Sequence, residues 1–115
     1  MKEELQKKLI FVYGTLKTGQ PNHILLENSK KLHNDMIDGR IYCLGNFPGL
    51  KQESGTVYGE IYEVDDNTLE KLDRLEGHPN FYTRQNIITQ KGIDCQTYFY
   101  NHAVAKRHLI ASGVW

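Results

Sequence analysis

The segment at residues 9–13, Leu-Ile-Phe-Val-Tyr, constrains the fold more than any other feature of the chain. Aliphatic, aromatic and β-branched residues follow one another there without a polar residue, which is typical of a strand buried on both faces. The run ends at Gly14, and we expect residues 13–16 to form the turn at the carboxyl end of the strand. The pattern therefore predicts a fold built around a sheet.

Further strands are predicted from period-two alternation and from β-branched and aromatic content. They lie at residues 36–44, 55–64, 81–89 and 94–100. Gly39 falls inside the first of them and indicates a β-bulge. Residues 45–49 are predicted to be a loop, and residues 90–93 are expected to join the last two strands into a hairpin.

Two short helices are predicted beside these strands. Pro21 is placed to open one at residues 21–26. The other begins after a cap at residues 65–67 and ends at Gly77. Its leucine stripe comprises Leu69, Leu72 and Leu75. The chain is thus expected to be a β-dominated α+β domain with enough strands to curl into a small barrel.

The size and charge of the chain limit its possible partners. Its 115 residues predict a single domain over residues 1–115. Fourteen basic and fourteen acidic residues give no net charge, so nothing indicates a nucleic-acid partner. No apolar stretch approaches the roughly 20 residues needed to cross a bilayer. We therefore expect no membrane association and a cytoplasmic location, while the oligomeric state stays open.

Cysteine and histidine do not form a recognisable metal or disulfide pattern. Cys43 and Cys95 lack the spacing of a zinc site or disulfide scaffold, and we expect both to be reduced and buried. The five histidines show no metal-binding motif. The sequence therefore predicts no metal site.

The turn at Tyr13, Gly14, Thr15 and Leu16 is the first candidate binding element. Where a buried strand breaks at a glycine, successive backbone N–H groups are released from the ladder. Such groups can bind an oxyanion or a carboxylate without a charged side chain. The alternative interpretation is an ordinary turn with no ligand.

Glu76 is the second candidate, because it follows directly on the last leucine of the helical stripe. It is therefore expected at the edge of the buried face, with Asp73 nearby, where its carboxylate can line a pocket. The alternative is an acid at the helix end that pairs with Lys71, Arg74 or Arg84.

Tyrosines on the predicted strands form a third feature. They are Tyr58, Tyr62, Tyr82, Tyr98 and Tyr100. Because alternate strand residues share a face, Tyr98 and Tyr100 are expected to point the same way. Their phenols could hold a small polar ligand, or they could simply pack in the core and rim with wet hydroxyls.

Taken together, these motifs resemble the gamma-glutamylcyclotransferase-like family, and most closely its short gamma-glutamylamine cyclotransferase branch. The likeness runs from about residue 9 to residue 115, and it rests on the order and spacing of the motifs. They are residues 10–16 (IFVYGTL), 22–23 (NH), 39–42 (GRIY), 47–50 (FPGL), 57–62 (VYGEIY), 72–77 (LDRLEG), 81–84 (FYTR) and 113–115 (GVW).

The resemblance implies an α+β fold with a small mixed β-barrel and flanking short helices. It also implies a reaction that releases an amine or amino acid from a small gamma-glutamyl compound, with 5-oxoproline as the other product and no cofactor. Glu76 corresponds to the family's general acid/base, and residues 13–16 to its binding turn. Tyr13, Tyr82 and Tyr98 would shape the pocket. Val114 departs from the pattern, since the family often has an acid there, and this leaves the outer wall of the cavity undefined.

The same residues also fit a second function, a non-catalytic module of the same fold that binds or sequesters a small anionic metabolite or a nucleotide-like signal. Retention of Glu76 next to the turn favours the enzyme, because a carboxylate that faces an anionic ligand weakens its binding.

Overall fold

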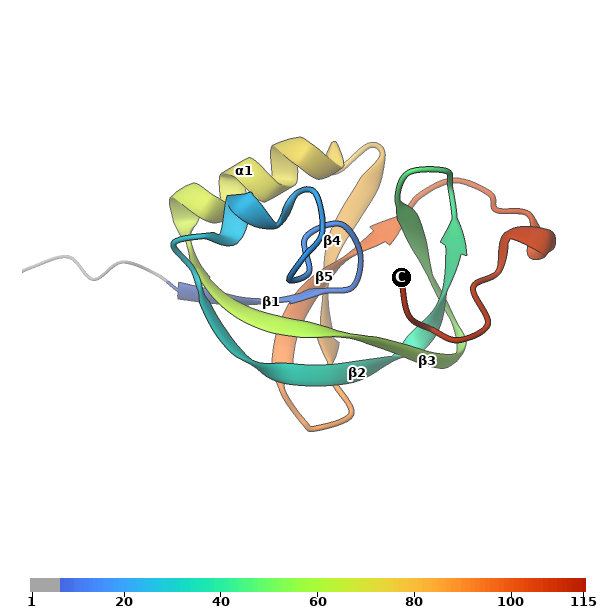
Figure 1. Cartoon of the computed structure of the whole chain (residues 1–115), viewed down its shortest axis with the longest axis horizontal. Helices are drawn as coiled ribbons and strands as arrows, with labels where there is room; N and C mark the ends of the chain where they lie inside the picture. Colours follow the sequence, from blue (N-terminus) through green and yellow to red (C-terminus); the bar gives the residue numbers. More distant parts are fainter. Residues whose placement is uncertain (1–6) are drawn as a thin grey trace, which may run out of the picture.

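The computed structural model describes residues 7–115 as one twisted sheet with an α-helix and two short 3₁₀ helices (Figure 1). The elements in chain order are β1 (Lys7–Val12), η1 (His23–Leu26), β2 (Lys30–Cys43), β3 (Pro48–Asp65), α1 (Asp66–Glu76), β4 (Tyr82–Ile88), β5 (Asp94–Tyr100) and η2 (Lys106–His108). The predicted α+β class and the predicted hairpin of β4 and β5 are confirmed.

The strand order is β2-β3-β1-β5-β4, with β1 in the middle. All pairs are antiparallel except β1 with β5, which run parallel and meet at Ile10 and Gln96. The predicted barrel is not confirmed, because the ladder ends at β2 and β4. The loop after β4 approaches β2 through one backbone bond, in which Gln90 N–H donates to Met36 O at 2.8 Å. The curved sheet is thus open.

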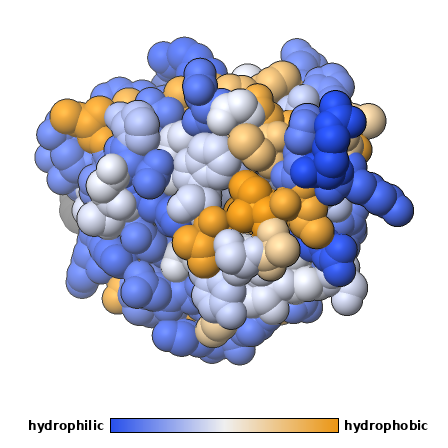
Figure 2. Space-filling model, turned by 45° about the vertical axis from the view of Figure 1, so that its right-hand side comes forward, coloured by the Kyte–Doolittle hydropathy of each residue, from blue (hydrophilic) through white to orange (hydrophobic). Residues whose placement is uncertain are grey.

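The central strand is buried on both faces, as its sequence predicts. Ile10 belongs to the apolar cluster on one side of the sheet, and Phe11 belongs to the cluster on the other side. Both side chains have no exposed surface. Figure 2 shows one outer face of the molecule, which is largely hydrophilic, with an apolar patch near its centre and smaller apolar areas toward its edges.

Two strands are longer than predicted. β2 begins at Lys30, and most of residues 30–35 pair with β3. β3 begins at Pro48, and residues 48–51 pair with β2, so the predicted loop at residues 45–49 is wrong for its last two residues. Much of these stretches is polar and exposed, and neither carries an apolar alternation from which a strand could be inferred. The bulge predicted at Gly39 is confirmed by a register shift between Asp38 and Arg40.

Helix α1 is capped at both ends as predicted. Asp65 Oδ1 accepts a hydrogen bond from Thr68 N–H at 2.8 Å, and Gly77 ends the helix in the left-handed region with φ of 64°. Leu69 and Leu72 are buried, but the prediction for Leu75 is wrong because it is 42% exposed. A three-residue spacing falls short of a full helical turn, so the stripe drifts around the helix and leaves Leu75 at its edge.

The other helical prediction is confirmed only in part. Residues 21–26 contain a single 3₁₀ turn, η1, whose one buried residue is Leu26. The helix α1 contacts η1, β1 and β3 and lies above β1 in Figure 1. Within residues 7–115, no helix has the length and apolar character needed to span a membrane.

Both cysteines are free thiols. Cys95 is buried, as expected, whereas Cys43 is half-buried and so departs from the prediction. No group of three or more His, Cys, Asp or Glu side chains is arranged to hold a metal ion in the described part of the chain.

Candidate active site

A pocket opens where β1 ends, and the predicted site residues surround it. Its cavity volume is about 30 Å³, within a hollow of about 340 Å³ that includes open solvent. We call it the inner pocket; its lining is Phe11, Val12, Tyr13, Gly14, Thr15, Leu16, Phe47, Pro48, Glu76, Tyr82 and Tyr98. The turn, the helix end and the hairpin, far apart in sequence, thus meet at one place.

A second hollow, with a cavity volume of about 320 Å³, adjoins it and is here called the outer pocket. The two pockets share Thr15, Phe47, Glu76 and Tyr82. The rest of the outer pocket is formed by Pro21, Asn22, Asn46, Leu75 and Phe81. Val114, whose departure from the family pattern left the outer wall undefined, lines neither pocket. Glu76 therefore stands at the junction between two connected spaces.

The turn after β1 is held by its carbonyl groups. The carbonyls of residues 14–16 accept hydrogen bonds at 2.9–3.1 Å from groups in residues 17–23. The donors are Lys17 N–H for Gly14, Asn22 N–H for Thr15 and the His23 ring for Leu16. The N–H groups of residues 14–16 have no acceptor within residues 7–115. The turn thus has the unsatisfied donors that its sequence predicts.

Gly14 allows the turn to approach β3 closely. A Cβ atom at this position would lie 2.7 and 2.8 Å from Cγ and Cδ of Pro48, closer than real Cβ contacts come. Pro48 in turn accepts a hydrogen bond from the hydroxyl of Tyr82 at 2.7 Å. Gly14 is therefore required by the packing of the pocket wall.

The three tyrosines of the inner pocket use their hydroxyl protons within the protein. Tyr13 donates to the carbonyl of Tyr98 at 2.8 Å, Tyr82 to the carbonyl of Pro48, and Tyr98 to Asp73 Oδ1 at 2.6 Å. Burial raises the pKa of all three phenols, so they stay protonated. The expectation of wet hydroxyls is wrong for Tyr82 and Tyr98. Tyr58, Tyr62 and Tyr100 line neither pocket.

Glu76, the last residue of α1, has neither an ion pair nor a side-chain hydrogen bond within residues 7–115. The cations predicted as its partners are placed elsewhere. Arg84 pairs with Asp73, and Arg74 lies 3.8 Å from Glu70 on the exposed side of the helix. Burial, without a compensating charge, raises the pKa of Glu76 from 4.5 to about 7. A carboxylate with this pKa can both accept and return a proton near neutral pH.

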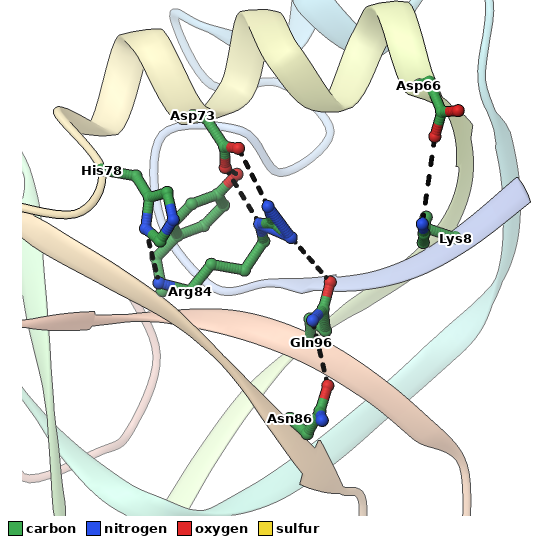
Figure 3. A network of polar contacts seen from close by, with 8 residues as sticks. Lys8, Asp66, Asp73, His78, Arg84, Asn86 and Gln96 are labelled. Atoms are coloured by element: carbon green, nitrogen blue, oxygen red, sulfur yellow. Dashed lines mark hydrogen bonds and ion pairs between the residues drawn. The ribbon is translucent and has the colours of Figure 1, made fainter.

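A polar network behind the inner pocket was missed at the level of sequence (Figure 3). Arg84 donates to both carboxylate oxygens of Asp73 at 3.0 Å and to Gln96 at 3.0 Å. Asp73 also accepts from the Tyr98 hydroxyl. The signal that could have found this network is the hairpin register, in which Arg84 lies directly opposite Tyr98.

Comparison with known proteins agrees with this architecture. A family model described as "Gamma-glutamyl cyclotransferase, AIG2-like" matches residues 10–115. A relative from Citrobacter rodentium, "Gamma-glutamylcyclotransferase family protein ytfP", is 41% identical over 92% of this chain and 93% of its own length.

Solved structures give the same result. A crystal structure of an AIG2-like protein from Mus musculus superposes with a TM-score of 0.81 and 30% identity, covering 95% of this chain and 88% of that one. The solution structure of ytfP from Escherichia coli gives a TM-score of 0.74 and 40% identity, covering 93% and 95%. The chain therefore belongs to the gamma-glutamyl cyclotransferase, AIG2-like family.

Proposed function

We propose that this protein is a cyclotransferase that converts a small gamma-glutamyl compound into 5-oxoproline and a free amine or amino acid. Glu76 is its general acid/base, and no cofactor takes part. The observation that supports this most strongly is the position of Glu76. Its carboxylate is unpaired, has a pKa of about 7 and lies at the junction of the two pockets, across from a turn with free N–H groups.

The first step is activation of the substrate's own α-amine. This group has a reference pKa near ~8 and is mostly protonated at neutral pH, so it must lose a proton before it can attack. A base whose pKa lies close to that of the amine transfers the proton with little energetic cost. Glu76 meets this requirement, whereas an exposed glutamate would be a weaker base by more than two pKa units.

The freed amine nitrogen then attacks the gamma-carbonyl carbon and closes a five-membered ring. Because the nucleophile and the carbonyl belong to one molecule, the enzyme has only to hold the folded conformer, and effective molarities on the order of 10⁵ M are available to such reactions. Free backbone N–H groups of Gly14, Thr15 and Leu16 are suited to bind the substrate carboxylate or the developing oxyanion.

Collapse of the intermediate breaks the bond between the carbonyl carbon and the leaving nitrogen. The proton held by Glu76 passes to that nitrogen, which leaves as a neutral amine. The second proton of the ring nitrogen, released as the lactam forms, is taken up by the departed amine, which becomes an ammonium ion, so no water is consumed. The outer pocket adjoins Glu76 and offers space for the leaving group. One carboxyl group thus serves both proton transfers.

The polar groups of the inner pocket complement a zwitterionic glutamyl moiety. The three phenol protons of the pocket are already engaged within the protein. A ligand in the inner pocket can therefore accept hydrogen bonds from the backbone N–H groups of residues 14–16. Those donors suit the substrate carboxylate, while Glu76 suits the ammonium group.

The test is incubation of the purified protein with a panel of gamma-glutamyl amines and gamma-glutamyl amino acids, with 5-oxoproline measured by mass spectrometry. We expect at least one compound to yield equal amounts of 5-oxoproline and free amine. If none is converted while an anionic metabolite raises the melting temperature, the chain is a binding module.

A further inference from the structure

The pair formed by Asp73 and Arg84 lies directly behind the inner pocket. Its two parallel hydrogen bonds of 3.0 Å make a bidentate contact, the strongest geometry available to these groups. Both side chains are only about one-fifth exposed, at 19% for Arg84 and 22% for Asp73. Charges held at this depth are screened less by solvent than charges on the surface.

The pair connects α1, β4 and β5, three of the elements that line the inner pocket. Asp73 lies on α1, three residues before Glu76. Arg84 lies on β4, two residues after Tyr82, and its Nη1 reaches Gln96 on β5 beside Tyr98. Figure 3 shows the arginine side chain between the helix and the hairpin.

The groups that face Glu76 from the elements around it are mostly uncharged. Tyr13 follows β1, Tyr82 lies on β4 and Tyr98 on β5, and all three are neutral phenols at physiological pH. His78, just beyond the helix, accepts the Arg84 backbone N–H on its Nδ1, and its ring is 6.5 Å from the Tyr98 ring. Asp73 is therefore the carboxylate near Glu76 on the pocket side of the helix.

We propose that Arg84 is a positioning residue for Glu76: it cancels the charge of Asp73 and fixes Asp73 as the acceptor for Tyr98, so that the pocket carries one uncompensated carboxylate. The catalytic meaning of this arrangement rests on the proposed role of Glu76. Without Arg84, a second negative charge would lie one helical turn from Glu76 and would disfavour its ionised form. The base would then be protonated over more of the physiological pH range.

The test measures the pKa of Glu76 directly, by carbon-13 NMR of its side-chain carboxyl group. The Glu76 signal is identified by its loss in Glu76→Gln. Arg84→Gln should raise the pKa of Glu76 by roughly 0.5–1.5 units, since it leaves Asp73 uncompensated. Asp73→Asn should lower it, because Arg84 then remains as an unpaired cation. The double variant should return it to within about 0.3 units of the wild-type value.

The comparison of wild type, the two single variants and the double variant separates an electrostatic role of Arg84 from a structural one. A purely structural role for Arg84 predicts shifts in the same direction for both single variants and no restoration in the double variant. Arg74→Gln is the matched control, because it removes an arginine from α1, the helix of Glu76, on the solvent side, where the partner Glu70 is 70% exposed. It should leave the pKa of Glu76 unchanged. If Arg84→Gln does not fold, Asp73→Asn still tests the expected downward shift.

In the pH profile of kcat/KM, the acidic limb should shift in each variant by the same amount as the pKa of Glu76 measured by NMR. An unchanged pKa of Glu76 in Arg84→Gln and in Asp73→Asn would overturn the inference while leaving the proposed reaction intact. Conversely, the predicted NMR shifts in a protein that produces no 5-oxoproline would support the electrostatic pairing and refute the proposed function.

Discussion

Asp73 and Glu76 lie three residues apart on α1, but within residues 7–115 only Asp73 has a cationic partner. Arg84 and the hydroxyl of Tyr98 satisfy the Asp73 carboxylate from β4 and β5. Glu76 points instead to the junction of the inner and outer pockets. Two acids on one short helix therefore have different chemistry, because the sheet supplies a counter-charge to one and an apolar wall to the other.

Glu76→Gln should stabilise the protein at alkaline pH. The folded-state pKa of about 7 lies above the ordinary value of 4.5, so the folded state holds the proton more tightly and the free energy of unfolding falls as pH rises from 4.5 to 7. Above pH 7 the variant, which carries no buried charge, should be more stable than wild type by about 1–3 kcal/mol. Urea denaturation at pH 8 measures this difference.

At pH 4.5 the same comparison should give nearly equal stabilities, because the wild-type carboxyl group is then protonated in the folded chain and half protonated in the unfolded chain. A constant difference between wild type and Glu76→Gln from pH 4 to pH 8 would contradict the buried-carboxylate account.

The pH dependence of turnover should carry the same signature. If Glu76 must be ionised to accept the substrate's proton, kcat/KM should fall tenfold per unit below a pKa of about 7. An exposed glutamate would place this limb near its ordinary pKa of 4.5. Initial rates of 5-oxoproline release between pH 5 and pH 8 check the prediction, and a flat profile over that range would exclude Glu76 as the base.

Gly14→Ala should weaken substrate binding by crowding. The new Cβ would press on the ring of Pro48, and the carbonyl of Pro48 holds the hydroxyl of Tyr82 in the pocket wall. Such overpacking costs about 1–3 kcal/mol of stability, and we expect KM to rise by about tenfold. The double variant with Pro48→Ala removes the crowding atoms and should recover part of the loss.

Gly92→Ala is the control for that experiment. Gly92 has a φ of 85° in the hairpin turn and no heavy atom within 4 Å of a built Cβ, so its replacement strains the backbone without touching the pocket. It should lower stability by about 1 kcal/mol and leave KM unchanged. Equal effects of the two substitutions on KM would show that crowding at Pro48 is not the cause.

Thr89→Val should destabilise the fold without affecting catalysis. Asp35 and Thr89 are 3% and 4% exposed, and the Thr89 hydroxyl donates to Asp35 Oδ2 at 2.5 Å, joining the loop after β4 to β2. Valine keeps the shape but leaves a buried carboxylate oxygen without its donor, at a cost of about 1–3 kcal/mol. Thermal denaturation and the kcat of the variant test the two halves of the prediction. A loss of kcat without a loss of stability would contradict it.

Local patterns predicted the elements that carry the candidate site. The apolar run before Gly14 identifies β1, and the cap at Asp65 with Gly77 at the other end delimits α1, because each signal is contained within a few neighbouring residues. The family resemblance then pointed to the residues that the fold brings together. The sequence also predicts that Glu76 lines a pocket, because it follows the leucine stripe of α1; the pocket is found there although Leu75, the leucine next to Glu76, is exposed.

What the sequence did not predict depends on contacts between distant segments. Residues 30–35 are mostly polar, and they form a strand by pairing with β3 across an irregularity between Lys31 and His33. The openness of the sheet depends on how β2 and β4 curve toward each other, which no local pattern encodes. In the sequence Arg84 is one of three candidate partners for Glu76, and only the packing of β4 against α1 assigns it to Asp73.

The most direct test of the central claim is turnover of a gamma-glutamyl substrate in water enriched in oxygen-18, by wild type and by Glu76→Gln. Cyclisation consumes no water, so wild type should release the amine together with unlabelled 5-oxoproline. The variant should be slower by about 10²–10⁴-fold. Labelled glutamate as the product, or equal rates for the two proteins, would contradict intramolecular cyclisation with Glu76 as its general acid/base.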